Sequence, residues 1–436
     1  ICFHPCEDVC NRGKIDEPVS IRNLKRFVAD YEWDQIQKGE SVERPPDEKP
    51  VEIKMDYQEK VAIIGGGPAG LTCAYDLAIK GYPVTVFDAN EKLGGMMTYG
   101  IPAYRLARDF LEFELDLIVE KGIKVELGKR FGVDFNFEDL KKAGYQTIMF
   151  ATGAPFTKKI PLEGIDVKGV LEAIPFLKET NEGRKPDIGK KIVVIGGGNV
   201  AIDVARSAIR IMEPGSEVNV ICLESREEMP AHEWEIVEAL EEGVNIHPSW
   251  GPSKIISDSS GVTGIETIKC VSVFDELKKF SPSFDKGIKK TFEASTILLA
   301  IGQMSDFSFL SDDIRTKNGV IETDPLTLET TVKGIFAGGD NVTGPKSLVV
   351  AVAQGHRASD SIHRYLRGMD LREDREPVEK TKEFAEIPKN TYPTGIPRHL
   401  MPTLEASTRK TSFVEMETGF TAEMAVEEAS RCLNCA

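Results

Sequence analysis

The chain has 436 residues, of which 41% are apolar, so it is long enough to bury two or three hydrophobic cores. Its net charge of -16 argues against a surface that neutralises nucleic-acid phosphates or binds anionic lipid. No stretch approaches the roughly 18 to 20 apolar residues that span a bilayer, and no signal peptide opens the chain, so we expect a soluble, cytoplasmic protein.

The first residues combine closely spaced cysteines with a helical pattern. Cys2, Cys6 and Cys10 precede an Asp-Glu-Pro start signal, and apolar residues then recur at helical spacing. Grouped thiols in a large acidic chain without a secretory signal more often bind metal than form disulfides. We expect a helical module over residues 1–33 and a charged, proline-bearing linker over 34–57.

A first nucleotide-binding unit is predicted from Lys60 onward, where β-branched runs alternate with helical ones as in a doubly wound α/β fold. The strand-like run 61–64 leads into Gly-Gly-Gly-Pro-Ala-Gly at 65–70, which satisfies G-x-G-x-x-G between a strand and a helix. Asp88 ends the next strand, where a carboxylate accepts both ribose hydroxyls of an adenosine. The alternative is a glycine-rich turn followed by a surface acid.

A second unit repeats this pattern about 130 residues further along. The strand-like run 191–195 leads into Gly-Gly-Gly-Asn-Val-Ala at 196–201, and its second strand ends at Glu224. Two such fingerprints suggest two nucleotides held face to face, which suits hydride transfer. We expect the later strands 296–300 and 334–337 to complete the first sheet.

The last third of the chain adds an acid and a tail. Asp340 follows Gly338-Gly339 at a strand end and precedes a helical run, which suits the ribityl and pyrophosphate of a flavin, although a structural turn explains the glycines as well. The tail from residue 373 is rich in charge and proline and is expected to wrap the body. A helix over 421–431 would deliver Cys432 and Cys435.

Several segments in one order resemble the small subunit of glutamate synthase and the flavin half of dihydropyrimidine dehydrogenase, a family of NAD(P)H-dependent FAD and iron-sulfur oxidoreductases. The matching segments are 2–10, 65–70, 94–102, 151–153, 196–201, 227–231, 300–303, 337–340 and 431–435. The resemblance implies an α/β fold with two Rossmann-like domains, the NAD domain inserted in the FAD domain, and a helical N-terminal iron-sulfur module. The implied FAD domain covers 58–154 and 299–372, the NAD(P) domain 155–298, and the C-terminal extension 373–436.

The same resemblance implies binding residues but no catalytic side chain, because hydride would pass directly between the cofactors. FAD would contact Gly65, Gly67, Pro68, Ala69, Gly70, Asp88, Gly95, Thr152, Gly153, Gly339 and Asp340. The nicotinamide nucleotide would contact Gly196, Gly198, Asn199, Val200, Ala201, Glu224 and Arg226.

One departure from the family bears on the choice of nucleotide. Relatives that use NADPH typically carry an arginine pair after the second strand of the nicotinamide unit, where this chain has Leu223-Glu224. A carboxylate there repels a 2'-phosphate, so we predict NADH, although Arg226 lies close enough to bind a phosphate.

A second departure concerns the clusters. A [4Fe-4S] cluster needs four ligands, and the first group supplies Cys2, Cys6 and Cys10. In dihydropyrimidine dehydrogenase a glutamine completes one cluster, but the corresponding residue here is Arg26, a permanent cation, so a further upstream cysteine is expected. Cys432 and Cys435 resemble the first half of another cluster site. A zinc knuckle is the alternative at either end.

We therefore predict an NADH-oxidising flavoprotein subunit that relays single electrons through iron-sulfur clusters to a partner subunit of a larger complex. Three alternatives stay open: an NADPH-dependent glutamate synthase small subunit, a flavin-based electron-bifurcating subunit, and a non-catalytic flavin and cluster scaffold.

Overall fold

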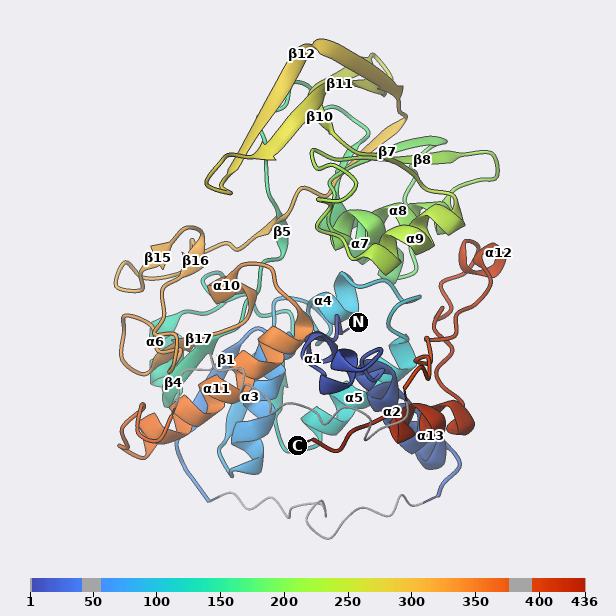
Figure 1. The fold of residues 1–436 in the computed structure, drawn as a ribbon. Coiled ribbons are helices and arrows are strands. Elements are labelled where there is room, and N and C mark those ends of the chain that lie inside the picture. Colours follow the sequence, from blue (N-terminus) through green and yellow to red (C-terminus); the bar gives the residue numbers. More distant parts are fainter. Residues whose placement is uncertain (1, 41–55, 376–393, 436) are drawn as a thin grey trace.

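The computed structural model describes residues 2–40, 56–375 and 394–435, and two parallel five-stranded sheets organise it (Figure 1). The first sheet has the order β17-β4-β1-β2-β3. Its strands are β1 Lys60–Ile64, β2 Val84–Phe87, β3 Lys124–Glu126, β4 Tyr145–Phe150 and β17 Ile335–Ala337. The central strand β1 is buried along four of its five residues, as expected for a parallel strand covered on both faces.

Two helices pack together against this sheet, α3 Pro68–Ile79 and α11 Leu348–Leu366 (Figure 1). Their contact is close because Gly355 has no side chain: a Cβ there would lie 2.6 Å from the Ala69 carbonyl oxygen. The helix expected after the first fingerprint and the helical run expected after Asp340 are both confirmed.

The second sheet repeats the topology with the order β6-β13-β7-β8-β9. Its strands are β6 Val170–Glu172, β7 Lys191–Ile195, β8 Glu217–Ile221, β9 Asn245–His247 and β13 Thr296–Leu299. The expectation that 296–300 would join the first sheet is wrong, because β13 pairs in parallel with both β6 and β7. All four of its residues are buried there, so the second core needs this strand. Only β17 returns to the first sheet.

A three-stranded antiparallel sheet projects from the second unit and was not expected from the sequence (Figure 1). It consists of β10 Trp250–Asp258, β11 Gly261–Phe274 and β12 Phe280–Glu293, inserted between β9 and β13. Much of β12 is exposed, so it lacks the apolar alternation by which a strand is recognised.

Shorter elements fill the remaining connections. The helices of the two units are α4 Met96–Tyr99, α5 Arg108–Val119, α6 Phe137–Lys142, α7 Ala173–Asn181, α8 Asn199–Ile211, α9 Glu233–Glu242 and α10 Asp340–Thr343. The short strands are β5 Phe156–Thr157, β14 Gln303–Met304, β15 Thr316–Lys317 and β16 Val320–Ile321. No helix in the ranges given above has the length and apolar character that a bilayer crossing demands.

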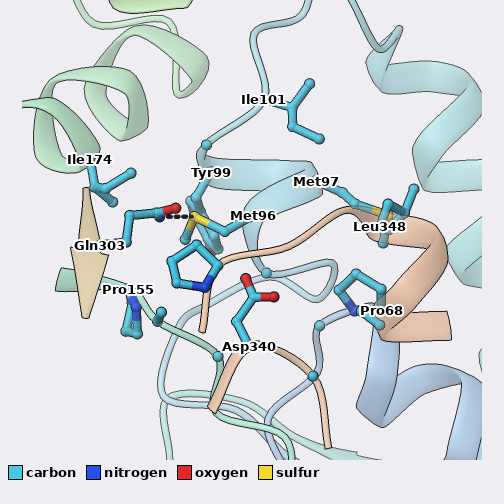
Figure 2. Close-up of a pocket in the computed structure, with 18 of the residues that line it drawn as sticks. Pro68, Met96, Met97, Tyr99, Ile101, Pro155, Ile174, Gln303, Asp340 and Leu348 are labelled. Atoms are coloured by element: carbon cyan, nitrogen blue, oxygen red, sulfur yellow. Dashed lines mark hydrogen bonds between the residues drawn. The ribbon is translucent and has the colours of Figure 1, made fainter. Parts of the chain in front are cut away.

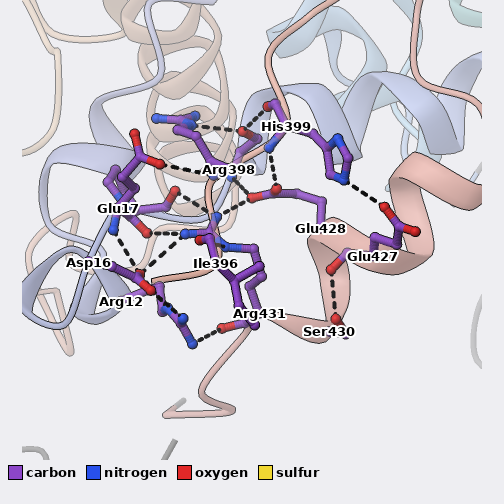
Figure 3. A network of polar contacts seen from close by, with 12 residues as sticks. Arg12, Asp16, Glu17, Ile396, Arg398, His399, Glu427, Glu428, Ser430 and Arg431 are labelled. Carbon is purple, nitrogen blue, oxygen red and sulfur yellow. Dashed lines mark hydrogen bonds and ion pairs between the residues drawn. The ribbon is translucent and has the colours of Figure 1, made fainter. Parts of the chain in front are cut away.

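The two ends of the chain pack on each other (Figure 3). The N-terminal elements are α1 Pro5–Asp8, the 3-10 helix Asn11–Lys14 and α2 Ile21–Gln37, and the C-terminal ones are α12 Ala406–Arg409 and α13 Ala422–Ser430. Helix α2 continues past residue 33, into the stretch expected to be linker; residues 41–55 of that linker lie outside the described residues. The buried Arg431 donates hydrogen bonds to the carbonyl oxygens of Glu17 and Pro18, and its ion pair with Glu428 is 2.7 Å. The tail is therefore fixed directly to the N-terminal module.

Candidate functional site

A cavity of about 1130 Å³ lies between the two units, at the carboxyl ends of their strands, and Figure 2 shows part of its lining. Most residues expected to bind FAD line it: Gly65, Gly67, Pro68, Ala69, Asp88, Gly95, Thr152, Gly153, Gly339 and Asp340. Gly70 lies behind this wall. Of the residues expected to bind the nicotinamide nucleotide, Asn199 and Val200 line the same cavity, and Gly196, Gly198, Ala201, Glu224 and Arg226 do not.

The glycines of the first fingerprint let neighbouring backbone segments approach so closely that a side chain at these positions would collide with them. Gly65 has a φ of +112°, and a Cβ there would collide with the Ala151 carbonyl. A Cβ on Gly70 would collide with the Gly65 carbonyl, and one on Gly95 would lie 3.0 Å from the Cα of Gly67. Helix α3 begins beside these glycines, so the free N–H groups and the partial positive charge of its N-terminus face the cavity. The cradle fits a dinucleotide pyrophosphate.

Asp88 is held ready at the end of β2. Its side chain is buried, Oδ2 accepts a hydrogen bond from the Gly66 N–H at 2.8 Å, and Oδ1 accepts one from the Asn90 N–H at 2.7 Å. A carboxylate fixed in this way keeps lone pairs for ribose hydroxyls without having to reorganise.

Asp340 lines the cavity at the start of α10 (Figure 2). Its Oδ1 accepts a hydrogen bond from the Lys346 N–H at 3.1 Å. Burial raises the pKa of Asp340 to about 6, because the charged form loses hydration there. A polyol hydroxyl of a flavin would give this acid a further hydrogen-bond partner.

An apolar wall was not assigned from the sequence. Met96, Tyr99, Pro155, Ile174 and Gln303 surround the middle of the cavity in Figure 2, and the Gln303 amide lies 3.8 Å from the Met96 sulfur. Three of these residues lie inside segments that carried the family resemblance, so the motifs contained the signal although no role had been attached to those positions. A planar aromatic ring system could pack against this apolar surface.

The acid of the second unit lies beside its fingerprint, as Asp88 does in the first. A Cβ on Gly197 would lie 2.7 Å from Glu224 Oε2, so the carboxylate occupies the ribose side of the glycine turn. Arg226 donates to both carboxylate oxygens of Glu233, at 2.9 and 2.7 Å. The arrangement fits a nucleotide whose adenosine lies outside the cavity and whose other end enters it.

The N-terminal loop reaches the same cavity. Cys2 and Phe3 line it, and the Phe3 ring stacks on His232 with centroids 5.9 Å apart. His232 in turn stacks on Trp234 at 4.3 Å, and its backbone N–H donates to Asn199 of the second fingerprint. The cysteine-bearing loop therefore contacts the second unit directly.

The cysteines themselves do not form a completed metal centre. In the part of the chain that the structure covers, no group of three or more His, Cys, Asp or Glu side chains could hold a metal ion. Cys435 accepts a hydrogen bond from the Asn11 amide at 3.4 Å, which brings the two cysteine-bearing ends together. Arg26, which was expected at the position of the glutamine ligand of dihydropyrimidine dehydrogenase, forms ion pairs with Asp30 and Glu415. Cys73 and Cys222 are buried, as expected for small apolar residues.

Comparison with known proteins agrees with this geometry. The profile of the pyridine nucleotide-disulphide oxidoreductase family matches residues 59–355. The chain is 38% identical to the beta subunit of the NADP(+)-dependent formate dehydrogenase of Moorella thermoacetica, over all of this chain and 64% of that subunit. It is 35% identical to the beta subunit of the NADPH-Fe(3+) oxidoreductase of Geobacter sulfurreducens, over all of this chain and 68% of that subunit.

The resemblance found in the sequence is confirmed, since proteins named as a glutamate synthase small chain and an NAD-dependent dihydropyrimidine dehydrogenase subunit also match. Among solved structures, FprA of Mycobacterium tuberculosis in complex with NADPH superposes with a TM-score of 0.60 at 15% identity, covering 72% of this chain and 85% of FprA. That likeness shows the fold: two Rossmann-like units joined as expected.

Proposed function

Because the chain belongs to the pyridine nucleotide-disulphide oxidoreductase family, we propose that it takes hydride from a nicotinamide nucleotide onto FAD and relays electrons to a partner subunit. The observation that carries the proposal is the single cavity lined by both fingerprint regions and by Cys2. FAD, when bound, supplies the step from a two-electron donor to one-electron acceptors.

The residues of this chain bind, orient and exclude water. Asp88 and the glycine cradle would hold the adenosine and pyrophosphate, and Asp340 would fix the ribityl chain. The apolar wall around Met96 and Tyr99 keeps water from the reacting rings, which strengthens the electrostatic interactions inside the cavity. The two fingerprints would bring their nucleotides together, and holding two reactants in the right geometry lowers the barrier to their reaction.

Disulfide reduction, which the family name includes, is not part of this proposal. A disulfide reductase needs a pair of thiols beside the flavin, and among the described residues Cys2 is the sole cysteine lining the cavity. Electrons are therefore assigned to a carrier other than a disulfide.

For the carrier we propose iron-sulfur clusters bound by Cys2, Cys6 and Cys10 and by Cys432 and Cys435, each completed by ligands beyond these. Support comes from the grouping of soft thiol ligands at two ends that pack together, and from the position of Cys2 on the cavity wall. The relatives are named as subunits, so a redox partner subunit is the proposed acceptor.

For the donor we propose NADH, on the position of Glu224 beside Gly197 and the pairing of Arg226 with Glu233. Two relatives named for NADP(+) and NADPH favour the other nucleotide. Arg226 is the residue through which NADPH would be accepted, because release from Glu233 frees a cation two positions from the acid.

The test is an anaerobic titration of the purified protein with NADH and with NADPH, following flavin bleaching and the spin signals of reduced clusters. We expect bleaching by NADH at lower concentration than by NADPH, followed by cluster signals. Glu224→Gln should reduce the difference between the NADH and NADPH concentrations needed for bleaching. Arg226→Gln should leave bleaching by NADH unchanged. Preference for NADPH that Arg226→Gln abolishes would overturn the NADH assignment and favour the glutamate synthase-like alternative.

The cluster assignment has its own control. Cys6→Ser and Cys432→Ser should each lower iron content, whereas Cys73→Ser, a buried thiol of α3, should not. Bleaching without spin signals in the wild type would contradict the relay and favour the zinc alternative. Unchanged nucleotide oxidation with loss of complex assembly in the cysteine variants would favour the scaffold role.

A further inference from the structure

One side chain of the first unit connects it to two helices of the second. Arg105 lies in the segment after α4, and its Nη1 donates to both carboxylate oxygens of Asp203 on α8, at 2.8 and 2.7 Å. Its Nη2 donates to Glu235 Oε1 on α9 at 2.5 Å. All three residues line the cavity between the units.

The three side chains of this link are largely buried, so the geometry of their hydrogen bonds is well fixed. The side chains of Arg105, Asp203 and Glu235 are 18%, 9% and 3% exposed. A guanidinium presents its donors in a rigid planar fork, so two carboxylates bound to it are fixed in both distance and direction. Helix α8 begins at the second fingerprint, so whatever fixes Asp203 also fixes that end of the nicotinamide site.

We propose that Arg105 is the positioning residue that sets the nicotinamide unit against the flavin unit, and that Glu235 makes this link sensitive to protonation. The inference rests on the proposed hydride transfer between the two units and adds to it the residues that control the alignment of the two rings.

The surroundings of Glu235 support its part. Its Oε2 is buried and has no hydrogen-bond partner among the described residues. The charges facing it are Arg105 from the first unit, Asp203 and Arg206 from α8, and Glu238 from its own helix. Burial raises the pKa of Glu235 to about 7, and Arg105 opposes that rise.

The direction of the pH effect follows from linkage. Because Arg105 favours the ionised carboxylate, ionisation of Glu235 must strengthen its bond to Arg105 by the same amount. The link is therefore tighter above pH 7 than below it. The rate constant for hydride transfer should rise through that range and flatten in Glu235→Gln.

The experiment is stopped-flow bleaching of FAD-loaded protein by a saturating nucleotide, together with hydrogen exchange of the apoprotein. Arg105→Met should retain FAD and lose about 10- to 100-fold in the bleaching rate constant, since misplacement by about 1 Å costs as much. The nucleotide dissociation constant should change far less, and Arg105→Lys should recover part of the rate. Exchange should increase at residues 101–107 and 230–236.

Arg409→Met is the matched control. The Arg409 side chain is 3% exposed and joins the C-terminal tail to α9 through Glu241 and Glu242, but it does not line the cavity. Its loss should lower thermal stability and leave the bleaching rate within about twofold. If no nucleotide bleaches the flavin of the wild-type protein, the proposed function is refuted. If Arg105→Met has the same bleaching rate constant and the same hydrogen exchange as the wild type, this inference alone is refuted.

Discussion

The two nucleotide-binding units share one topology and differ in how firmly their sites are prepared. In both sheets the fingerprint strand, β1 or β7, is central, with two strands on either side. Asp88 is fixed by hydrogen bonds from Gly66 and Asn90, whereas no hydrogen bond to the Glu224 carboxylate is found within the described residues. A fixed acid suits a group held permanently, and an unfixed one suits a nucleotide that must enter and leave.

The units also differ in what anchors them. The first is covered by apolar contact between α3 and α11. The second carries a buried charge network in which Arg206 and Arg210 share Glu242, and the tail's Arg409 joins it. Polar anchoring specifies one arrangement of segments, at a cost in desolvation that apolar packing avoids.

The largest effect is expected from breaking that network. Glu242→Ala leaves two buried guanidinium groups without their shared carboxylate, so the free energy of unfolding should fall by about 3 to 5 kcal/mol. Urea denaturation of the apoprotein measures it. Glu241→Ala removes an exposed partner of Arg409 and should cost less than about 1 kcal/mol. Equal losses would mean that the second unit is not anchored by its buried charges.

Asp340 gives the first unit a pH dependence. Its pKa is raised to about 6 from an ordinary 3.8, so the folded chain binds the extra proton between those values. The resulting stability is complete below about pH 4 and is lost as the pH rises through 6, by up to about 3 kcal/mol. Thermal melts of apoprotein should show this decline in the wild type and not in Asp340→Asn. If the melting temperatures of the wild type and Asp340→Asn change with pH in the same way, the Asp340 side chain is hydrated in the folded protein.

The third glycine position separates the two fingerprints. Gly70→Ala drives a Cβ into the Gly65 carbonyl, and overpacking of about 1 to 3 kcal/mol should lower FAD affinity by about 10- to 100-fold. The reverse change, Ala201→Gly, should alter nucleotide affinity by less than about fivefold, the size of a helix-propensity effect. Fluorescence titration with FAD and with NADH measures both. Unchanged FAD affinity in Gly70→Ala would show that both glycine turns can accommodate an alanine side chain.

The smallest effect is expected from replacing Asp88, the acid of the first unit. Asp88→Asn keeps the shape but loses charge-assisted acceptors, so FAD affinity should fall by about 1 to 2 kcal/mol. Glu224→Gln should leave FAD content unchanged. A loss of FAD in both variants would mean that the two acids do not serve separate nucleotides.

Much of the candidate site could be predicted because its signals are local. A strand, a glycine turn, a helix and an acid at the next strand end follow one another between residues 60 and 88 in the first unit and between residues 191 and 224 in the second. Their geometry follows from backbone sterics and the helix dipole. The cavity-lining residues around Gly65 and Asp88 therefore lie where expected. Met96 and Gln303 were within recognised segments, yet nothing local says that a side chain 207 positions away is its neighbour.

The sequence by itself determined the two fingerprints, their acids, and the α/β class, since each depends on neighbours along the chain. Only the tertiary structure decided which sheet receives Thr296–Leu299, because a short apolar strand satisfies either core. It alone joined Arg105 to Asp203 and Glu235, and it packed the two cysteine-bearing ends together. These contacts depend on burial and charge pairing between distant segments, for which no periodicity in the sequence provides a signal.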